Sequence, residues 1–148
     1  MISIRLALPV ERRDLEQLQW RASLNNPGDR VALLANPDAI ALPLEQIESG
    51  QVFVAEEGNH VVGFAAVLDR PDNDVELDGL FVDPASWRQG IGRALVDRCV
   101  AYASGRNSRA LHVVGNPHAR AFYEIVGFVA VGMHKTRFGE GILMQRTL

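Results

Sequence analysis

The feature that most constrains the fold is a strand–turn–helix segment at residues 80–95. An apolar run ends at Pro84, a polar turn follows, and a helical pattern begins at a Gly-x-Gly, residues 90–92. The first N–H groups of a helix have no partner within the helix, the helix dipole favours an anion there, and glycine lets the backbone approach a ligand closely. Arg88 and Arg93 add positive charge beside the glycines. The segment therefore predicts an α/β fold with an anion site suited to a pyrophosphate.

A tight turn without a ligand is the alternative interpretation of these glycines, because a lone Gly-x-Gly is a weak signal. Two other phosphate-binding motifs do not fit the segment. A dinucleotide fingerprint requires Gly or Ala where Leu95 stands, and a P-loop requires Lys and then Ser or Thr after its last glycine. The segment thus matches neither of these two nucleotide-binding classes.

Hydrophobic periodicity divides the rest of the chain into strands and helices. Period-two alternation of Ile2, Ile4, Leu6 and Leu8 predicts a strand over residues 2–8. The helical spacing of Leu15, Leu18 and Ala22 predicts a helix that ends at residues 25–28. Further strands are expected at residues 52–54, 61–68, 75–82, 110–114, 128–131 and 142–144, and further helices at 44–48, 90–104 and 117–126. We therefore expect one domain, residues 1–148, of mixed α/β class, with helices packed on a largely antiparallel sheet.

The composition bounds the class of protein and its partners. The chain has 148 residues, of which 47% are hydrophobic and 22% charged, as is typical of a soluble globular domain. Its net charge of -3 argues against binding to nucleic acid, which requires a basic surface. Cys99 is the lone cysteine and cannot form an internal disulfide, and we find neither a signal peptide nor an apolar run that could span a membrane. We therefore expect a soluble, cytoplasmic protein that binds neither nucleic acid nor a membrane.

Two motifs, in this order, carry a family resemblance. The first comprises Leu80-x-Val82-x-Pro84 and then Arg88-Gln89-Gly90-Ile91-Gly92-Arg93-Ala94-Leu95. The second is Asn116-x-x-Ala119-x-x-Phe122-Tyr123-x-x-x-Gly127-Phe128. They resemble the acetyl-CoA-binding motif and the second motif of the GCN5-related N-acetyltransferases, the GNAT family. The opening, Ile4-Arg5 with Asp14, Leu15 and Leu18, resembles the first strand and helix of that family.

This resemblance implies a splayed seven-stranded sheet with helices on both faces and with acetyl-CoA between the fourth and fifth strands. By analogy, the backbone of Leu80 and Val82 would pair with the pantetheine arm, and the N–H groups of residues 88–93 would hold the pyrophosphate. One departure is Trp87, where the family usually has Gln or Arg, and we expect rearranged side-chain contacts there rather than a loss of binding. The predicted cofactor-binding residues are Leu80, Phe81, Val82, Arg88, Gln89, Gly90, Ile91, Gly92, Arg93 and Asn116. Asn116 is also expected to cap the helix that follows it.

Tyr123 is the predicted general acid. A tyrosine with a pKa near 10 stays protonated at neutral pH and can donate a proton to the departing thiolate of CoA. It lies at the tyrosine of the second GNAT motif, which acts as general acid in many members of the family. The helical spacing of Ala119, Phe122 and Val126 predicts that Phe122 faces the core and that Tyr123 points elsewhere. The alternative is that Tyr123 is a packing residue.

Glu76 and Asp78 are the candidate bases, because the acceptor amine must lose a proton to attack. Being two residues apart on a strand, they are expected to point to the same side. The alternatives are a water relay, and a solvated strand end that continues the acidic turn at residues 72–74. His112 is a weaker candidate base. The four histidines show no metal-ligand spacing, so no metal is expected.

Together these features predict an N-acetyltransferase that moves the acetyl group of acetyl-CoA to a primary amine by direct attack in a ternary complex. We expect a small-molecule acceptor, whose identity the sequence does not give, and a homodimer, as in many members of the family. The alternatives are a protein or peptide N-acetyltransferase and a non-catalytic acyl-CoA-binding regulatory module.

Overall fold

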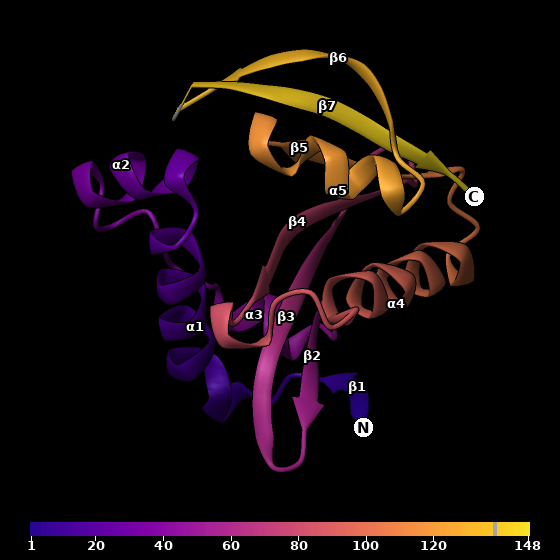
Figure 1. Cartoon of the computed structure of the whole chain (residues 1–148). Coiled ribbons are helices and arrows are strands. Elements are labelled where there is room, and N and C mark those ends of the chain that lie inside the picture. Colours follow the sequence, from indigo (N-terminus) through magenta and orange to yellow (C-terminus); the bar gives the residue numbers. More distant parts are fainter. Residues whose placement is uncertain (138) are drawn as a thin grey trace. The chain divides into compact units, whose positions relative to one another are not determined.

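The computed structural model describes residues 1–137 and 139–148, and the side chains of all of these except residues 27 and 28. The described chain divides into two compact units. The first comprises Met1–Ala66 and Gly79–Arg98, and the second comprises Val67–Asp78 and Cys99–Leu148. Figure 1 shows the elements coloured in chain order.

Strands and helices follow one another largely as the sequence predicts. The strands are β1 (Ile2–Leu6), β2 (Val52–Glu57), β3 (His60–Asp69), β4 (Val75–Val82), β5 (Ala110–Gly115), β6 (Val129–Thr136) and β7 (Gly139–Thr147). The helices are α1 (Arg12–Leu24), α2 (Pro27–Ala35), α3 (Leu44–Glu48), α4 (Ile91–Gly105) and α5 (Arg120–Ile125), with short 3-10 helices at Pro9–Glu11, Pro84–Ser86 and Pro117–Ala119. Over the described residues the strands form a seven-stranded sheet in the order β1-β2-β3-β4-β5-β7-β6. Pairs β1–β2, β2–β3, β5–β7 and β6–β7 are antiparallel and β4–β5 is parallel, which confirms the predicted mixed α/β class with a largely antiparallel sheet.

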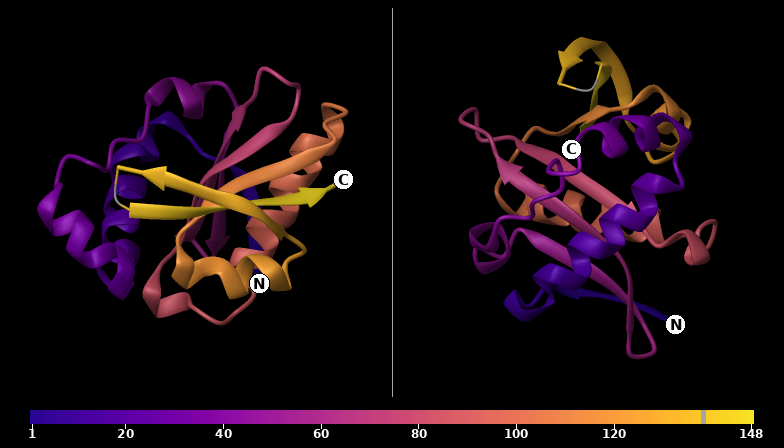
Figure 2. Two further views of the ribbon diagram at one scale, coloured as in Figure 1. Left: turned by 90° about the horizontal axis from the view of Figure 1, so that it is seen from above. Right: turned by 90° about the vertical axis from the view of Figure 1, so that its left-hand side faces the viewer.

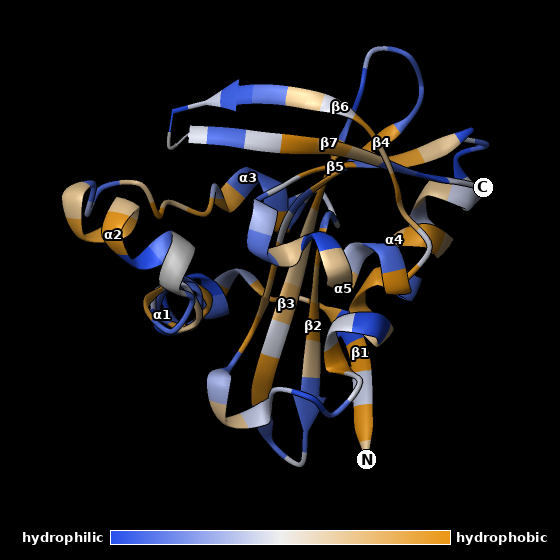
Figure 3. Cartoon of the chain, turned by 45° about the horizontal axis from the view of Figure 1, so that its top comes forward, coloured by the Kyte–Doolittle hydropathy of each residue, from blue (hydrophilic) through white to orange (hydrophobic). Residues whose placement is uncertain are grey.

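An apolar cluster forms the core of the first unit. Leu15, Leu18 and Ala22 are the buried residues of α1, which confirms the predicted helical stripe. Leu15 and Leu18 belong to one cluster with buried residues of β2 and β3. β2 has four consecutive buried residues, as expected for a strand that is covered on both faces. In Figure 3 the middle of β2 and β3 is coloured hydrophobic and the turn between them hydrophilic.

Helix α2 is the element that the sequence analysis missed. α1 ends at Leu24 and α2 begins at Pro27, so the polar run that ends one helix also starts the next. Proline is well suited to the first turn of a helix, since its missing N–H has no partner there in any case. Arg30 N donates to Asn26 O at 2.9 Å, which begins the new helical ladder. The short helix predicted near residues 44–48 is confirmed as α3.

The end of β1 departs from the predicted alternation. Leu6 and Leu8 are 48% and 52% exposed, whereas Ala7 between them is buried. Ala7 N donates to Val52 O at 2.9 Å, and a 3-10 helix begins at Pro9. The predicted strand over residues 2–8 is therefore too long by two residues, because the chain leaves the strand geometry after Leu6.

Helix α4 buries the stripe that the sequence predicts. Ile91, Leu95 and Cys99 are buried, while Arg93 and Asp97 are exposed. Cys99 is therefore a core residue, as is common for an unpaired cysteine. Among the described residues, none of the helices is long and apolar enough to cross a membrane.

In the second unit, β4 pairs with β5 over three residues, and the last pair is Leu77 with Val113. Both strands continue beyond this pair, so the pairing covers part of each strand, as expected for a splayed sheet. β5 then pairs with β7 over its whole length, and β7 pairs with β6 as a long hairpin (Figure 2).

Candidate functional site

The predicted site residues fall in both units. The backbone set from Leu80 to Arg93 lies in the first unit. The second unit contains Glu76, Asp78, Asn116 and Tyr123.

In the first unit, the segment between β4 and α4, residues 83–93 (the β4–α4 segment), is fixed by local hydrogen bonds. Asp83 is the N-cap of the 3-10 helix Pro84–Ser86, and its Oδ1 accepts from Ala85 N at 3.2 Å. Its Oδ2 forms an ion pair with Arg21 of α1 at 3.0 Å. Asp83 N donates to Val62 O at 2.8 Å. The segment is thus anchored to α1 and β3 where it begins.

The same segment has an unusual backbone where the pyrophosphate site is predicted. Arg88 and Gly90 have positive φ angles of 66° and 79°. A non-glycine residue in the left-handed region costs on the order of 1–3 kcal/mol and is found mainly where the structure requires it. Left-handed residues beside right-handed ones turn successive N–H groups into one concavity, which is a known form of anion site.

Helix α4, which begins at the end of this segment, adds further N–H groups. Its first helical hydrogen bond joins Ala94 N to Gly90 O at 3.1 Å. The N–H groups of residues 90–93 therefore lie outside the helical ladder, at the positive end of the helix dipole. Arg88, Gln89 and Gly90 are exposed to solvent. The segment can therefore hold a pyrophosphate through its backbone.

The C-terminal end of β4 is partly buried, and one of its carbonyl groups already accepts a hydrogen bond. Leu80, Phe81 and Val82 are all half-buried. The ring of Phe81 packs on Phe64 with their centroids 5.3 Å apart. A Cβ on Gly79 would lie 2.8 Å from this ring, so the glycine makes room for Phe81.

Trp87 contacts the backbone that the sequence assigns to pantetheine. Its indole Nε1 donates to Val82 O at 2.7 Å. The carbonyl oxygen of Val82 has two lone pairs. One accepts from Trp87, so pantetheine would have to share this oxygen with the indole. Trp87 is 43% exposed, which is high for so large an apolar side chain.

In the second unit, Tyr123 faces the core, and the prediction for this helix was wrong. Tyr123 is 8% exposed, whereas Phe122 is half-buried. The Tyr123 ring makes edge contacts with Phe122 and Phe128, at centroid distances of 5.3 and 5.4 Å. A Cβ on Gly115 would lie 3.1 Å from the ring, so this glycine makes room for it.

The error has a geometric cause. Residues 119, 122 and 126 share one face of a continuous helix, but so do residues 119, 123 and 126. α5 begins only at Arg120, after the 3-10 helix Pro117–Ala119, and the second set is the one that faces inward. The spacing alone could not choose between the two aromatic residues.

Asn116 is the helix cap that the sequence predicts. Its Oδ1 accepts from Ala119 N at 3.0 Å, and Pro117 follows it in the first helical position. A role in cofactor binding is a separate prediction that this contact does not test.

The candidate bases lie at the start of β4. Glu76 is half-buried and Asp78 is exposed, and they alternate with buried Val75 and Leu77. The two carboxylates therefore share the side of β4 opposite to its buried residues, as predicted. In the parallel pairing Glu76 is the register partner of His112.

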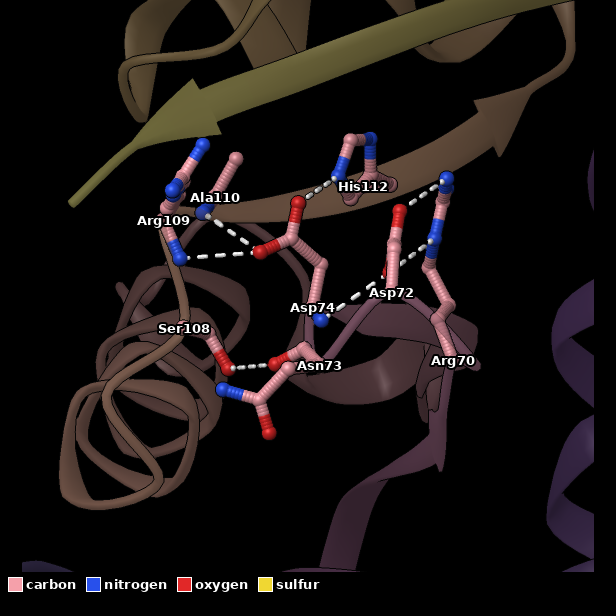
Figure 4. A network of polar contacts seen from close by, with 8 residues as sticks. All are labelled: Arg70, Asp72, Asn73, Asp74, Ser108, Arg109, Ala110 and His112. Carbon is pink, nitrogen blue, oxygen red and sulfur yellow. Dashed lines mark hydrogen bonds and ion pairs between the residues drawn. The ribbon is translucent and has the colours of Figure 1, made fainter.

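His112 is tied to a polar network, the Asp74 network, drawn in Figure 4. His112 Nε2 lies 2.8 Å from Asp74 Oδ2. Asp74 Oδ1 accepts from the backbone N–H groups of Arg109 and Ala110, at 2.8 and 3.4 Å. Ser108 Oγ donates to Asn73 O at 2.7 Å. These contacts join the turn before β4 to the start of β5.

The network lowers the pKa of its two carboxyl groups. The hydrogen bond from His112 holds the pKa of Asp74 below its ordinary value, and the N–H groups of Arg109 and Ala110 act in the same direction. The hydrogen bond from Arg70 likewise lowers the pKa of Asp72. The hydrogen bonds therefore stabilise the charged form of both carboxyl groups.

Asp72, Asp74 and His112 also form a possible metal-ligand group, with one ligand atom of each within 4.8 Å of the others over the described residues. Sequence spacing could not reveal this group, because the fold brings His112 to the two aspartates. Asp72 already accepts from Arg70 Nε and Nη2 at 3.2 and 2.9 Å, and Asp74 Oδ1 accepts from two N–H groups. A cation would have to displace the guanidinium, so the group is better described as a hydrogen-bonded network.

Several contacts at the site were not predicted from the sequence. They are the ion pair of Arg21 with Asp83, which anchors the β4–α4 segment, the hydrogen bond from Trp87 to Val82, and the contact of Asp74 with His112. The pair Asp83-Pro84 is a helix-start signal, since Asp is a common N-cap and Pro suits the next position. The other contacts join residues far apart in sequence or depend on the turn geometry, and no local pattern announces them.

Comparison with known proteins gives a consistent picture. A family model described as the acetyltransferase (GNAT) family matches residues 13–128. Mycothiol acetyltransferase of Beutenbergia cavernae is 33% identical over 117 residues, which are 70% of this chain and 39% of that protein. The chain therefore spans about two fifths of the length of that relative.

Two further proteins are similar over most of their length. Peptidyl-lysine N-acetyltransferase YjaB of Salmonella typhimurium is 27% identical over 133 residues, 89% of this chain and 86% of that protein. The solved structure of the acetyltransferase yncA of Salmonella typhimurium, with its cofactor acetyl-CoA, superimposes with a TM-score of 0.75. It is 22% identical and the match covers 100% of this chain and 94% of that one, a likeness in fold.

Proposed function

The chain belongs to the acetyltransferase (GNAT) family and is an acetyltransferase with acetyl-CoA as its acetyl donor, and from this premise we propose that it acetylates a primary amine of a small molecule. The observation that carries the proposal is the backbone of the β4–α4 segment. Left-handed Arg88 and Gly90 and the first N–H groups of α4 offer several donors to one anion. We assign the pyrophosphate of acetyl-CoA to these donors.

The proposed reaction is a direct attack within a ternary complex. The neutral amine attacks the thioester carbonyl, an N–C bond forms, and the C–S bond breaks to release the thiolate of CoA. Glu76 or Asp78, directly or through water, accepts the proton that the amine loses. Tyr123 donates a proton to the departing thiolate. The contacts of its ring with Phe122 and Phe128 support this role, because a fixed ring holds its hydroxyl in one direction.

The acceptor is proposed to be a small cationic amine. Glu76 and Asp78 support this choice, since an amine in its ammonium form is attracted to carboxylates before it is deprotonated. Asp72 and Asp74 add little to this attraction, because they are bonded to Arg70 and His112. A peptide lysine is the second candidate acceptor, and it is favoured by the likeness to a peptidyl-lysine N-acetyltransferase.

An acceptor screen tests the function. Release of free thiol from acetyl-CoA is measured with polyamines, amino acids, aminoglycosides and lysine peptides. Steady release with a small amine supports the proposal, and release with peptides alone transfers it to the second candidate. Tight binding of acetyl-CoA with no release for any amine would identify a regulatory acyl-CoA-binding module instead.

We also propose that the protein is a cytoplasmic homodimer. The edge strand β6 supports the dimer, because its alternate residues Val129, Val131 and Met133 are 64%, 56% and 57% exposed. An exposed apolar edge strand tends to pair with another chain. Light scattering should give twice the mass of one chain, and a single-chain mass would contradict the dimer.

Tyr123→Phe removes one hydroxyl and keeps the ring, so the packing against Phe128 should persist. If the hydroxyl protonates the thiolate, kcat should fall about 10²–10⁴-fold, the usual range for general acid–base help, while KM for acetyl-CoA stays near its wild-type value. The matched control is Tyr102→Phe, which removes a hydroxyl that donates to Asp69. A fall of less than about threefold, measured where chemistry limits the rate, would make Tyr123 a packing residue.

A further inference from the structure

Trp87 is a surface indole with a strong hydrogen bond. Its Nε1 lies 2.7 Å from Val82 O, although the side chain is 43% exposed. A solvent-exposed indole could donate to water instead, so a short bond to one particular carbonyl indicates a defined geometry. The bond closes a loop from the last residue of β4 to the residue before left-handed Arg88.

The loop that this bond closes is short and internally bonded. Ser86 N donates to Asp83 O at 2.8 Å, and Trp87 N donates to Pro84 O at 3.3 Å. These backbone bonds set the shape of the loop, and the indole ties its far end back to β4. Trp87 itself has an extended backbone, with φ −63° and ψ 153°, so the helical turn stops there. The chain direction at Arg88 is therefore set by the residue that the indole anchors.

The anchor lies next to the donors assigned to the pyrophosphate. Arg88 has a φ of 66°, a conformation that L residues other than glycine rarely adopt. Such a residue relaxes to an ordinary conformation unless its neighbours hold it. An anion site made of backbone N–H groups binds well only if these groups already converge before the ligand arrives.

We propose that Trp87 is a positioning residue for the pyrophosphate of acetyl-CoA, which acts through the carbonyl of Val82 to hold the N–H groups of residues 88–93 in place; this inference rests on the proposed function. The indole does not contact the phosphate. Trp87 stands where the GNAT motif usually has Gln or Arg. Its hydrogen bond to the backbone of Val82 fixes the loop, in place of a side-chain contact with the phosphate.

The proposal predicts an effect that depends on which part of the ligand is present. Trp87→Phe keeps an aromatic ring and removes the N–H donor. Loss of one such bond should weaken binding of acetyl-CoA about three- to tenfold. The same loss is expected for 3′-phosphoadenosine 5′-diphosphate (3′-phospho-ADP), the part of acetyl-CoA that carries the pyrophosphate. Binding of S-acetylpantetheine, which has no pyrophosphate, should not weaken, because the variant leaves the carbonyl of Val82 free to accept from pantetheine.

The experiment compares wild type, Trp87→Phe and Trp20→Phe. Acetyl-CoA and 3′-phospho-ADP are titrated by calorimetry, and S-acetylpantetheine by ligand-detected NMR. Trp20→Phe removes the other indole of the chain, which lies in α1, and should leave all three affinities unchanged. Thermal unfolding of each variant establishes that it is folded at the temperature of the titrations.

The outcomes are distinct. A loss confined to the two pyrophosphate ligands supports the proposal. Equal affinities in wild type and Trp87→Phe overturn it, and so does a loss of similar size for S-acetylpantetheine, which would place the effect on the pantetheine arm. If wild type itself does not bind acetyl-CoA, the proposed function fails and not this inference alone.

Discussion

At its N-terminal end, β4 is paired with β5, and Asp74, just before β4, is hydrogen-bonded to the N–H group of Arg109 and to the ring of His112 on β5. The C-terminal end of β4 lies beyond this pairing, and it is followed by a segment with two left-handed residues and with N–H groups outside the helical ladder. At the first end, the hydroxyl of Ser108 and the N–H groups of Arg109 and Ala110 donate to acceptors within the chain. The second end leaves donors for a ligand. We therefore propose that the second end binds acetyl-CoA and that the first end holds β4 and β5 together.

The exposure of the two ends supports the same distinction. The side chains of Asp74 and His112 are 14% and 18% exposed, and they satisfy each other. Arg88, Gln89 and Gly90 are exposed, although Arg88 is in a conformation that costs free energy. A strained backbone at an exposed turn is typical of ligand-binding sites, as at Arg88. A largely buried network with its hydrogen bonds made is typical of regions that stabilise the fold, as at Asp74.

The largest expected effect is on acetyl-CoA binding at the C-terminal end. Gly92→Glu places a bulky anion beside the N–H groups at the start of α4, so affinity for acetyl-CoA should fall by more than about 100-fold. Calorimetry measures the affinity of the folded variant. The control is Gly105→Glu at the other end of α4, where an added Cβ meets nothing within 4 Å. Unchanged affinity in Gly92→Glu would remove the pyrophosphate from this segment.

The next effect is on stability at the N-terminal end. Asp74→Asn removes a charged acceptor from two backbone N–H groups and His112, and should lower the free energy of unfolding by about 1–3 kcal/mol at neutral pH. Affinity for acetyl-CoA should change by less than about twofold. Chemical denaturation and calorimetry measure the two quantities. A variant with normal stability and weak binding would reverse the roles of the two ends.

This stability loss should depend on pH in one direction. The folded pKa of Asp74 lies below its unfolded value of about 3.9, so its contribution is fully present above about pH 4 and is lost as pH falls through the folded pKa. The difference in stability between wild type and Asp74→Asn should therefore shrink below about pH 4. Asp72 and Glu11, whose pKa values are lowered by Arg70 and Arg5, keep an acid dependence in both proteins. A difference that grows on acidification would contradict the assignment.

The smallest effect is expected at His112. His112→Gln can still donate to Asp74, so kcat should stay within about threefold of wild type if the histidine belongs to the network alone. Its register partner gives the contrast, because Glu76→Gln should lower kcat about 10²–10⁴-fold if Glu76 is the base. Steady-state rates over a range of pH measure both. A large fall in His112→Gln with a normal rate in Glu76→Gln would make His112 the base.

Patterns within single elements were the ones that the sequence predicted well. The buried stripe of α1, the start and stripe of α4 and the cap at Asn116 follow from local spacing and local hydrogen bonds. The short pairing of β4 with β5 agrees with the splayed sheet that the family resemblance implies. These features need only neighbours along the chain, or a motif that is itself contiguous.

Choices that depend on packing were not predictable in the same way. Phe122 and Tyr123 both fit a helical face, and only the room made by Gly115 and the contact with Phe128 decides for Tyr123. The His112 interaction with Asp74 joins a strand to a turn that is distant in sequence. The Trp87 contact with Val82 depends on the path of a turn. Helices α1 and α2 are separated by two residues, so the sequence shows no clear break between them.

We propose that backbone N–H groups of the β4–α4 segment hold acetyl-CoA and that the Asp74 network does not. A titration of the ¹⁵N-labelled protein with CoA, followed by amide chemical shifts, separates the two regions. We expect the largest downfield shifts at the amides of residues 88–93, and shifts near zero at Arg109 and Ala110, whose N–H groups already donate to Asp74. Saturable shifts concentrated at residues 109–112, with the amides of residues 88–93 unmoved, would contradict it.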